Sequence, residues 1–104
     1  MDIFKLLIIL ITFIIFFNNY ENQDFVPNDV NVLDISLKTN DGHLTLNLCE
    51  NVLNYGGTYY EYRFLKKFFS ITTYFDDINY LTILVNGELR ELAEGSLIDK
   101  INLH

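Results

Sequence analysis

The chain has 104 residues, half of them hydrophobic, and carries a formal net charge of −7 from 7 basic and 14 acidic residues. This length allows one small domain, and the acidic balance argues against binding to nucleic acid or to anionic lipid head groups. The one cysteine, Cys49, excludes an intrachain disulfide and a Cys/His zinc cluster, and no cofactor motif is visible.

The first segment is apolar. Residues 3–17 read IFKLLIILITFIIFF and cover about 22 Å as a helix, short of the ~30 Å of a hydrocarbon core, whereas extension to Tyr20 nearly spans it. No small-residue cleavage site follows, and no cysteine follows directly, which excludes a lipid-modified N-terminus. Three alternatives stay open: an uncleaved anchor, a cleaved signal segment, or a helix buried in the domain.

The first two alternatives place the domain outside the cytoplasmic membrane. Lys5 before the segment and Glu21 and Asp24 after it favour a single pass with the domain outside, or a secreted domain if the segment is cleaved. The predicted organisation is an anchor or signal segment over residues 1–20, a polar tether over 21–29, and a domain over 30–104.

A hairpin is predicted at the start of this domain. Val30 to Leu37 alternates apolar and polar residues, and His43 to Leu48 alternates again, with its leucines on one face. The residues between them, Thr39 to Gly42, include an Asp-Gly pair that accepts the backbone of a tight turn.

An amphipathic helix is predicted over residues 58–75. Phe64, Phe68, Ile71 and Phe75 recur at helical spacing, and Leu65 and Thr72 widen the stripe. Thr58 and Glu61 match a capping box at its start. The aromatic and β-branched content gives low intrinsic propensity, so packing must stabilise this helix.

A second hairpin is predicted after Asp76-Asp77. Ile78 to Val85 is strand-like, Asn86-Gly87 is a strong hairpin signal, and Glu88 to Leu92 is expected to return. Residues 97–101 are predicted as a further short strand or as cover for the core edge. The fold class is therefore α+β: a small, mainly antiparallel sheet of two hairpins with one amphipathic helix packed on it, preceded by the hydrophobic N-terminal helix.

This order of motifs resembles the GerMN domain over about residues 30–102. The residues that carry the resemblance are Asp41-Gly42 with Leu44, Leu46 and Leu48, the helix to Phe75, the run from Leu81 to Glu88, and Leu97-Ile98-Asp99. The chain departs from the family pattern at Ser70-Ile71-Thr72 and at Asp76, and it holds one copy where members often have two. The resemblance implies a non-enzymatic assembly module acting outside the cytoplasmic membrane in sporulation or spore germination.

Two pairs of residues are candidates for chemistry. His43 and Cys49 lie six residues apart on one predicted strand, about 20 Å if it is regular, too far for a nucleophile and its base. Asp76 and Asp77 are adjacent and lack the further oxygen ligands that a calcium loop needs. No catalytic residue and no metal ligand is predicted.

The predicted interaction surface is basic and rich in tyrosine. Arg63, Lys66 and Lys67 share one helical face, and Tyr59 and Tyr62 begin the same helix, where tyrosines are typical of interfaces. A solvated helix back is the alternative. The expected partners are envelope or spore-membrane proteins, including self-association, and the membrane through residues 3–20. A small envelope hydrolase or its accessory, and a small-ligand binder, are the competing functions.

Overall fold

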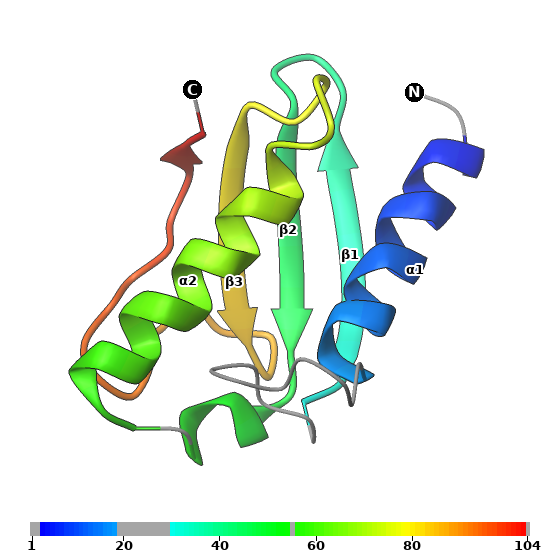
Figure 1. The fold of residues 1–104 in the computed structure, drawn as a ribbon. Coiled ribbons are helices and arrows are strands. Elements are labelled where there is room, and N and C mark those ends of the chain that lie inside the picture. The colour runs from blue at the N-terminus through cyan, green and yellow to red at the C-terminus, as the bar shows by residue number, and fades with distance from the viewer. Residues whose placement is uncertain (1–2, 19–29, 55, 104) are drawn as a thin grey trace.

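Two helices cover one face of a four-stranded sheet in the computed structural model, which describes residues 3–18, 30–54 and 56–103 (Figure 1). The elements are α1 (Ile3–Asn18), β1 (Val32–Lys38), β2 (His43–Leu48), a 3-10 helix (Glu50–Asn54), α2 (Thr58–Thr72), β3 (Tyr80–Val85) and β4 (Ile101–Asn102). The strand order is β1-β2-β3-β4. The β1–β2 and β3–β4 pairs are antiparallel, which confirms the predicted α+β class and the mainly antiparallel sheet.

The first hairpin is confirmed. Gly42 adopts a φ of 72°, and its N–H donates to the Lys38 carbonyl at 2.9 Å, which closes the turn. The Gly42 carbonyl also accepts the N–H groups of Asn79 and Tyr80, at 2.8 and 3.1 Å. The turn therefore ties the hairpin to the start of β3. The sequence did not indicate the register shift between Val32 and Asp34, a bulge in β1.

Helix α2 crosses from β2 to β3 and makes that central pair parallel, because parallel neighbours need a long crossover connection. Its inward stripe is confirmed, since Phe64 and Phe68 are buried. The helix ends at Thr72, before the predicted Phe75. The predicted capping box is wrong: Gly57 is the N-cap residue and no side chain caps the helix, because Glu61 bonds to a distant loop instead.

The second hairpin is reduced to its turn. Asn86 and Gly87 have φ of 53° and 83°, and Val85 and Glu88 exchange two backbone hydrogen bonds of 2.8 and 3.0 Å. The predicted return over Glu88 to Leu92 is wrong beyond that bridge. The chain leaves the sheet, buries Leu92 and runs to the start of α2 before it returns to β3. There the Ile98 carbonyl accepts the Ile83 N–H at 2.9 Å and β4 follows.

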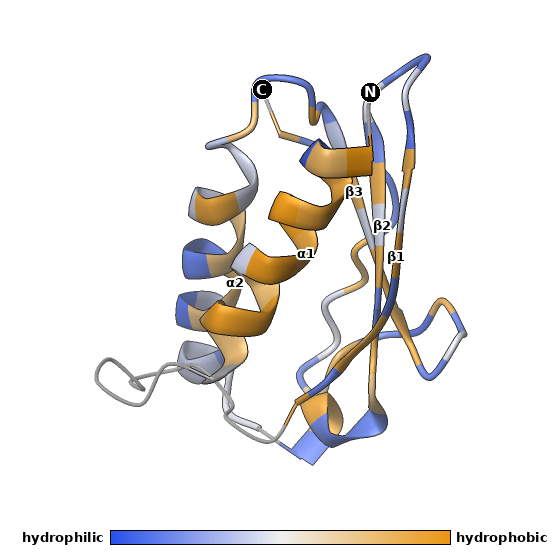
Figure 2. Ribbon diagram, turned by 90° about the vertical axis from the view of Figure 1, so that its right-hand side faces the viewer, coloured by the Kyte–Doolittle hydropathy of each residue, from blue (hydrophilic) through white to orange (hydrophobic). Residues whose placement is uncertain are grey.

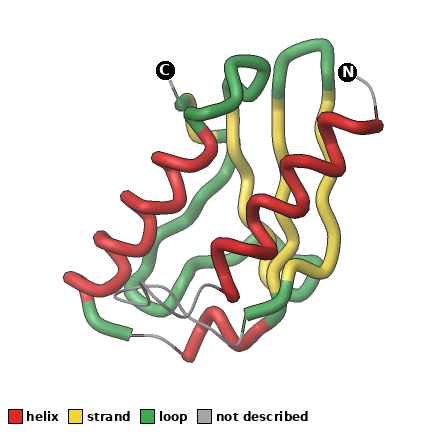
Figure 3. The backbone as a smooth tube through the Cα atoms, turned by 45° about the vertical axis from the view of Figure 1, so that its right-hand side comes forward, coloured by secondary structure: helices red, strands yellow, loops and turns green. Residues whose placement is uncertain are grey.

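Helix α1 packs on the domain next to β1 and on the same side of the sheet as α2 (Figures 1 and 3). Ile9, Phe13 and Phe17 are fully buried, and the Phe13 and Phe68 ring centroids are 4.8 Å apart. One side of α1 is therefore packed on the domain, while large apolar residues on its other side remain exposed. Among the described helices, none is both long and apolar enough to cross a membrane. The predicted tether over residues 21–29 lies outside the described residues.

Candidate functional site

The outer side of α2 brings together the five residues predicted as an interaction surface. The helix turns Phe64 and Phe68 toward the sheet, so the opposite side carries the polar residues, as its colouring in Figure 2 shows. Tyr59 and Tyr62 are 65% and 58% exposed. Arg63, Lys66 and Lys67 complete this group, which is called the α2 surface below.

Cations and rings alternate along the α2 surface. The Arg63 guanidinium carbon lies 6.0 Å from the Tyr59 ring centroid, and the Lys66 ammonium nitrogen lies 6.0 Å from that of Tyr62. These distances are at the outer limit of cation–π attraction, and Tyr59, Tyr62 and Lys66 are exposed while Arg63 is half-buried. A hollow of about 230 Å³ lies among the side chains of Arg63, Lys66, Lys67 and Ser70.

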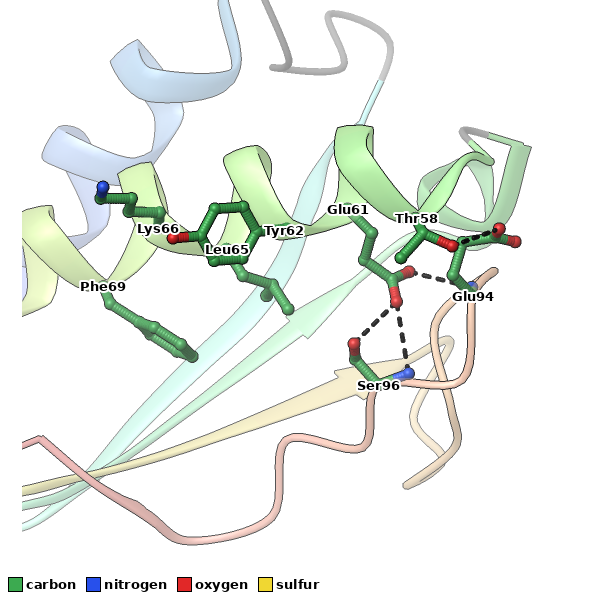
Figure 4. A pocket seen from close by; sticks show the side chains of 8 residues that line it. All are labelled: Thr58, Glu61, Tyr62, Leu65, Lys66, Phe69, Glu94 and Ser96. Atoms are coloured by element: carbon green, nitrogen blue, oxygen red, sulfur yellow. Dashed lines mark hydrogen bonds between the residues drawn. The ribbon is translucent and has the colours of Figure 1, made fainter.

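A larger groove of about 400 Å³ adjoins the α2 surface and shares two of its residues (Figure 4). It lies between α2 and the loop that follows Leu92. Its lining residues are Thr58, Glu61, Tyr62, Leu65, Lys66, Phe69, Glu94 and Ser96. Leu65 and Phe69 give it an apolar wall, whereas Lys66 and Glu94 bring opposite charges. This arrangement suits a chain segment that presents both apolar and charged side chains.

Glu61 is a buried carboxylate that closes the groove on one side. It accepts hydrogen bonds from the N–H groups of Glu94 and Ser96, at 3.1 and 3.3 Å, and from the Ser96 hydroxyl at 2.7 Å. Both carboxylate oxygens therefore have partners, and Glu61 clasps the loop to α2 (Figure 4). Its position one turn before Phe64 and Leu65, in line with the buried stripe, was the sequence signal that could have indicated this role.

The candidate residues for chemistry, His43, Cys49, Asp76 and Asp77, are not gathered at one place. His43 Nε2 lies 2.7 Å from the Thr82 hydroxyl, and the Cys49 sulfur accepts the Asn31 N–H at 3.2 Å. His43 is the first residue of β2, and Cys49 directly follows its last residue, Leu48. Asp77 pairs with Lys5 of α1, and Asp76 is exposed. Within the described residues no group of three or more His, Cys, Asp or Glu side chains is arranged to hold a metal ion.

No protein-family model matches the sequence, and no curated protein is significantly similar to it. Solved structures do match the fold. A candidate lipoprotein of Clostridium perfringens superposes with a TM-score of 0.72 at 18% identity, over 89% of this chain. The tandem GerMN domains of the sporulation protein GerM from Bacillus subtilis superpose with a TM-score of 0.61 at 24% identity, over 73% of this chain. The first GerMN domain of that protein gives 0.52 at 26% identity, over 71%.

The fold is thus a helix-covered sheet domain that is also found in a candidate lipoprotein and in a sporulation protein of known structure. More narrowly, the chain has a GerMN-like fold, as the motifs around Asp41-Gly42 and Asn86-Gly87 indicated. The chain spans 64% of the Clostridium protein and 27% of the tandem structure.

Proposed function

We propose that this protein is a membrane-tethered, extracytoplasmic protein-interaction module that acts in sporulation or spore germination without catalysing a reaction. The observation that carries the proposal is the likeness to GerMN domains of a sporulation protein and to a candidate lipoprotein. The apolar N-terminal segment supports an association with the membrane. Envelope or spore-membrane proteins, including further copies of the chain, are the proposed partners.

The α2 surface is the proposed contact. On a chain of net charge −7, it gathers three cations and two exposed tyrosines on one rigid helix. Such a surface suits an acidic partner, because unlike charges steer association and tyrosines provide contact area. The adjoining groove adds apolar wall at Leu65 and Phe69 for a side chain of the same partner.

Site-specific photo-crosslinking in the native host during sporulation tests this proposal. A photoreactive phenylalanine derivative replaces Tyr62 in the full-length protein, and the same residue at Tyr74, which is 87% exposed beyond the end of α2, is the matched control. We expect an envelope protein to be crosslinked from position 62 and much less from position 74. Equal capture from both positions, or none from position 62, would contradict the assigned surface.

Charge reversal tests whether the basic residues of the α2 surface make the contact. Lys66→Glu with Lys67→Glu should abolish the crosslink, whereas Lys38→Glu with Arg90→Glu, which removes the same charge from exposed sites elsewhere, should leave it intact. A crosslink that survives the first pair rejects the basic contact. The absence of any protein partner in a sporulating host would favour a small-ligand binder or an envelope hydrolase instead.

A further inference from the structure

Helix α1 carries a second surface that the core does not use. One side holds the fully buried Ile9, Phe13 and Phe17, and the other side is apolar too. Its large exposed residues are Ile3, Phe4, Leu7, Ile8, Ile11, Ile14 and Ile15, each between 43% and 79% exposed. Figure 2 looks toward the β1 edge of the molecule and shows α1 hydrophobic along its length there. These seven residues are called the outer face of α1 below.

The outer face of α1 has no group that a polar partner or water would bond. It consists of isoleucine, leucine and phenylalanine, and residues 3–18 contain no acidic side chain. The Thr12 hydroxyl donates back to the Ile8 carbonyl at 2.8 Å, which satisfies it within the helix as an apolar medium requires. The cation of the helix, Lys5, pairs with Asp77 of the domain.

This composition differs from that of a protein contact. Protein interfaces are enriched in aromatic residues, methionine and arginine and have a polar rim, as the α2 surface has in part. The outer face of α1 includes one aromatic residue, Phe4, but no methionine, no arginine and no polar residue. A contiguous aliphatic face of this kind fits acyl chains, which offer no hydrogen bonds. We infer that the outer face of α1 binds the hydrocarbon of a lipid bilayer, with the helix lying in the membrane plane while its inner face stays packed on the domain.

The packing of α1 separates this arrangement from a helix that spans the bilayer alone. A spanning helix is surrounded by lipid or by other helices, whereas α1 places Phe13 and Phe17 on Phe68 and Phe64 of α2, at centroid distances of 4.8 and 6.2 Å. Withdrawal of α1 would expose those rings to water and break the Lys5–Asp77 pair. The in-plane position satisfies both faces of the helix at once.

The charge of the chain selects the lipid. With a net charge of −7, the domain is repelled by anionic head groups, so the expected ligand is a zwitterionic bilayer such as phosphatidylcholine. This inference refines the membrane tether of the proposed function, and it is independent of the α2 surface. Capture of a protein partner can therefore fail while lipid binding holds, or the reverse.

Single tryptophans test the geometry, because the chain has none of its own. The full chain carries Ile11→Trp on the outer face, Phe13→Trp on the inner face, or Tyr74→Trp as a remote exposed control. Each is mixed with phosphatidylcholine vesicles whose acyl chains are brominated near the glycerol. We expect several-fold fluorescence quenching at position 11 and little at 13 or 74. Equal quenching at 11 and 13 would overturn the in-plane arrangement, and no quenching at 11 would overturn lipid binding.

Vesicle flotation with a matched pair of variants tests the surface. The triple change Ile8→Asn, Ile11→Asn and Ile15→Asn should lower the bound fraction at least tenfold. The control is Leu33→Asn, Leu89→Asn and Leu97→Asn, three residues of similar exposure elsewhere, and it should bind as the unchanged chain does. Circular dichroism of both variants verifies that they are folded. Equal loss in both variants, or a lipid-free dimer dissolved only by the first, would overturn the inference.

Discussion

The two helices on the sheet use their outer sides in opposite ways. Helix α2 is amphipathic: its inner stripe is buried with Phe64 and Phe68, and its outer side presents tyrosines and cations. Helix α1 buries an equally apolar stripe, with Phe13 and Phe17, but its outer side is apolar as well. The inner stripes of the two helices meet in one aromatic cluster. Both helices therefore contribute buried rings to the same core.

The two helices therefore differ only in the chemistry of their outer sides, which determines what each can contact outside the domain. A polar outer side is stable in water and binds partners by charge and ring contacts. An apolar outer side of seven large residues is unfavourable in water unless a membrane or another protein covers it. The polar outer side of α2 is the proposed protein contact, and the apolar outer side of α1 is the inferred membrane contact.

The largest expected effect comes from the cluster that both helices share. Phe68→Ala and Phe13→Ala each remove a fully buried ring and should lower the free energy of unfolding by about 3–5 kcal/mol. Guanidinium chloride unfolding of the full chain measures both. A loss below about 1 kcal/mol for Phe13→Ala with a full loss for Phe68→Ala would contradict an equal part for α1 in the core.

The next effect concerns the turn that meets the segment between α2 and β3. In Gly42→Ala the added Cβ would lie 2.3 Å from the Asp77 carbonyl oxygen and 2.7 Å from Asn79 Nδ2. The positive φ alone costs about 1–3 kcal/mol, and the overlap adds to it. Gly87→Ala is the control, because its φ is also positive but nothing lies within 4 Å. Equal losses in thermal unfolding would contradict a steric role for Gly42.

A smaller effect is expected at the clasp beside the α2 surface. Glu61→Ala leaves three donors of the Glu94–Ser96 loop without their acceptor, which should cost about 1–3 kcal/mol. Hydrogen exchange should accelerate at the Ser96 amide in this variant and remain unchanged in Glu91→Ala, an exposed residue nearby. Unchanged exchange in Glu61→Ala would show that the loop holds its place by packing alone.

The smallest effect is expected where α1 meets the domain through charge. Lys5 and Asp77 are partly exposed, with 37% and 50% of their side-chain surfaces accessible, so Lys5→Ala should cost about 0–1 kcal/mol and less at high salt. Unfolding at low and high ionic strength measures it, with Lys38→Ala as the control. A loss of unfolding free energy above about 2 kcal/mol is more than exposed pairs contribute. It would mean that the ion pair, rather than the aromatic cluster, holds α1 on the domain.

Local signals predicted the parts of the fold that local chemistry decides. Asp41-Gly42 and Asn86-Gly87 specify their turns because few other pairs accept the required backbone. The spacing of Phe64 and Phe68 predicts the inner stripe of α2, and so also the face that carries Arg63, Lys66 and Lys67. Their grouping needed no tertiary information.

Distant contacts decided the rest. The path of the chain after Glu88 depends on Glu61, which accepts a hydrogen bond from Ser96, 35 residues away in the sequence. No local pattern therefore distinguishes a returning strand from a loop there. The face of α1 that enters the core was not predictable either, because a helix that is apolar all round has no periodicity. Packing against Phe64 and Phe68 of α2 determines that the face with Phe13 and Phe17 is the buried one.

The parallel pairing at the centre of the sheet also sets the order in which the chain can fold. The β1–β2 hairpin closes over a four-residue loop, and hairpins of this kind form within about 1–10 μs. Strand β3 pairs with β2 only after the intervening 31 residues, from Cys49 to Asn79, have formed their crossover. We therefore expect the docking of α2, rather than the early hairpin, to limit the folding rate. Until β3 pairs with β2, the leucines of β2 that are buried in the folded domain, Leu44, Leu46 and Leu48, are expected to stay exposed.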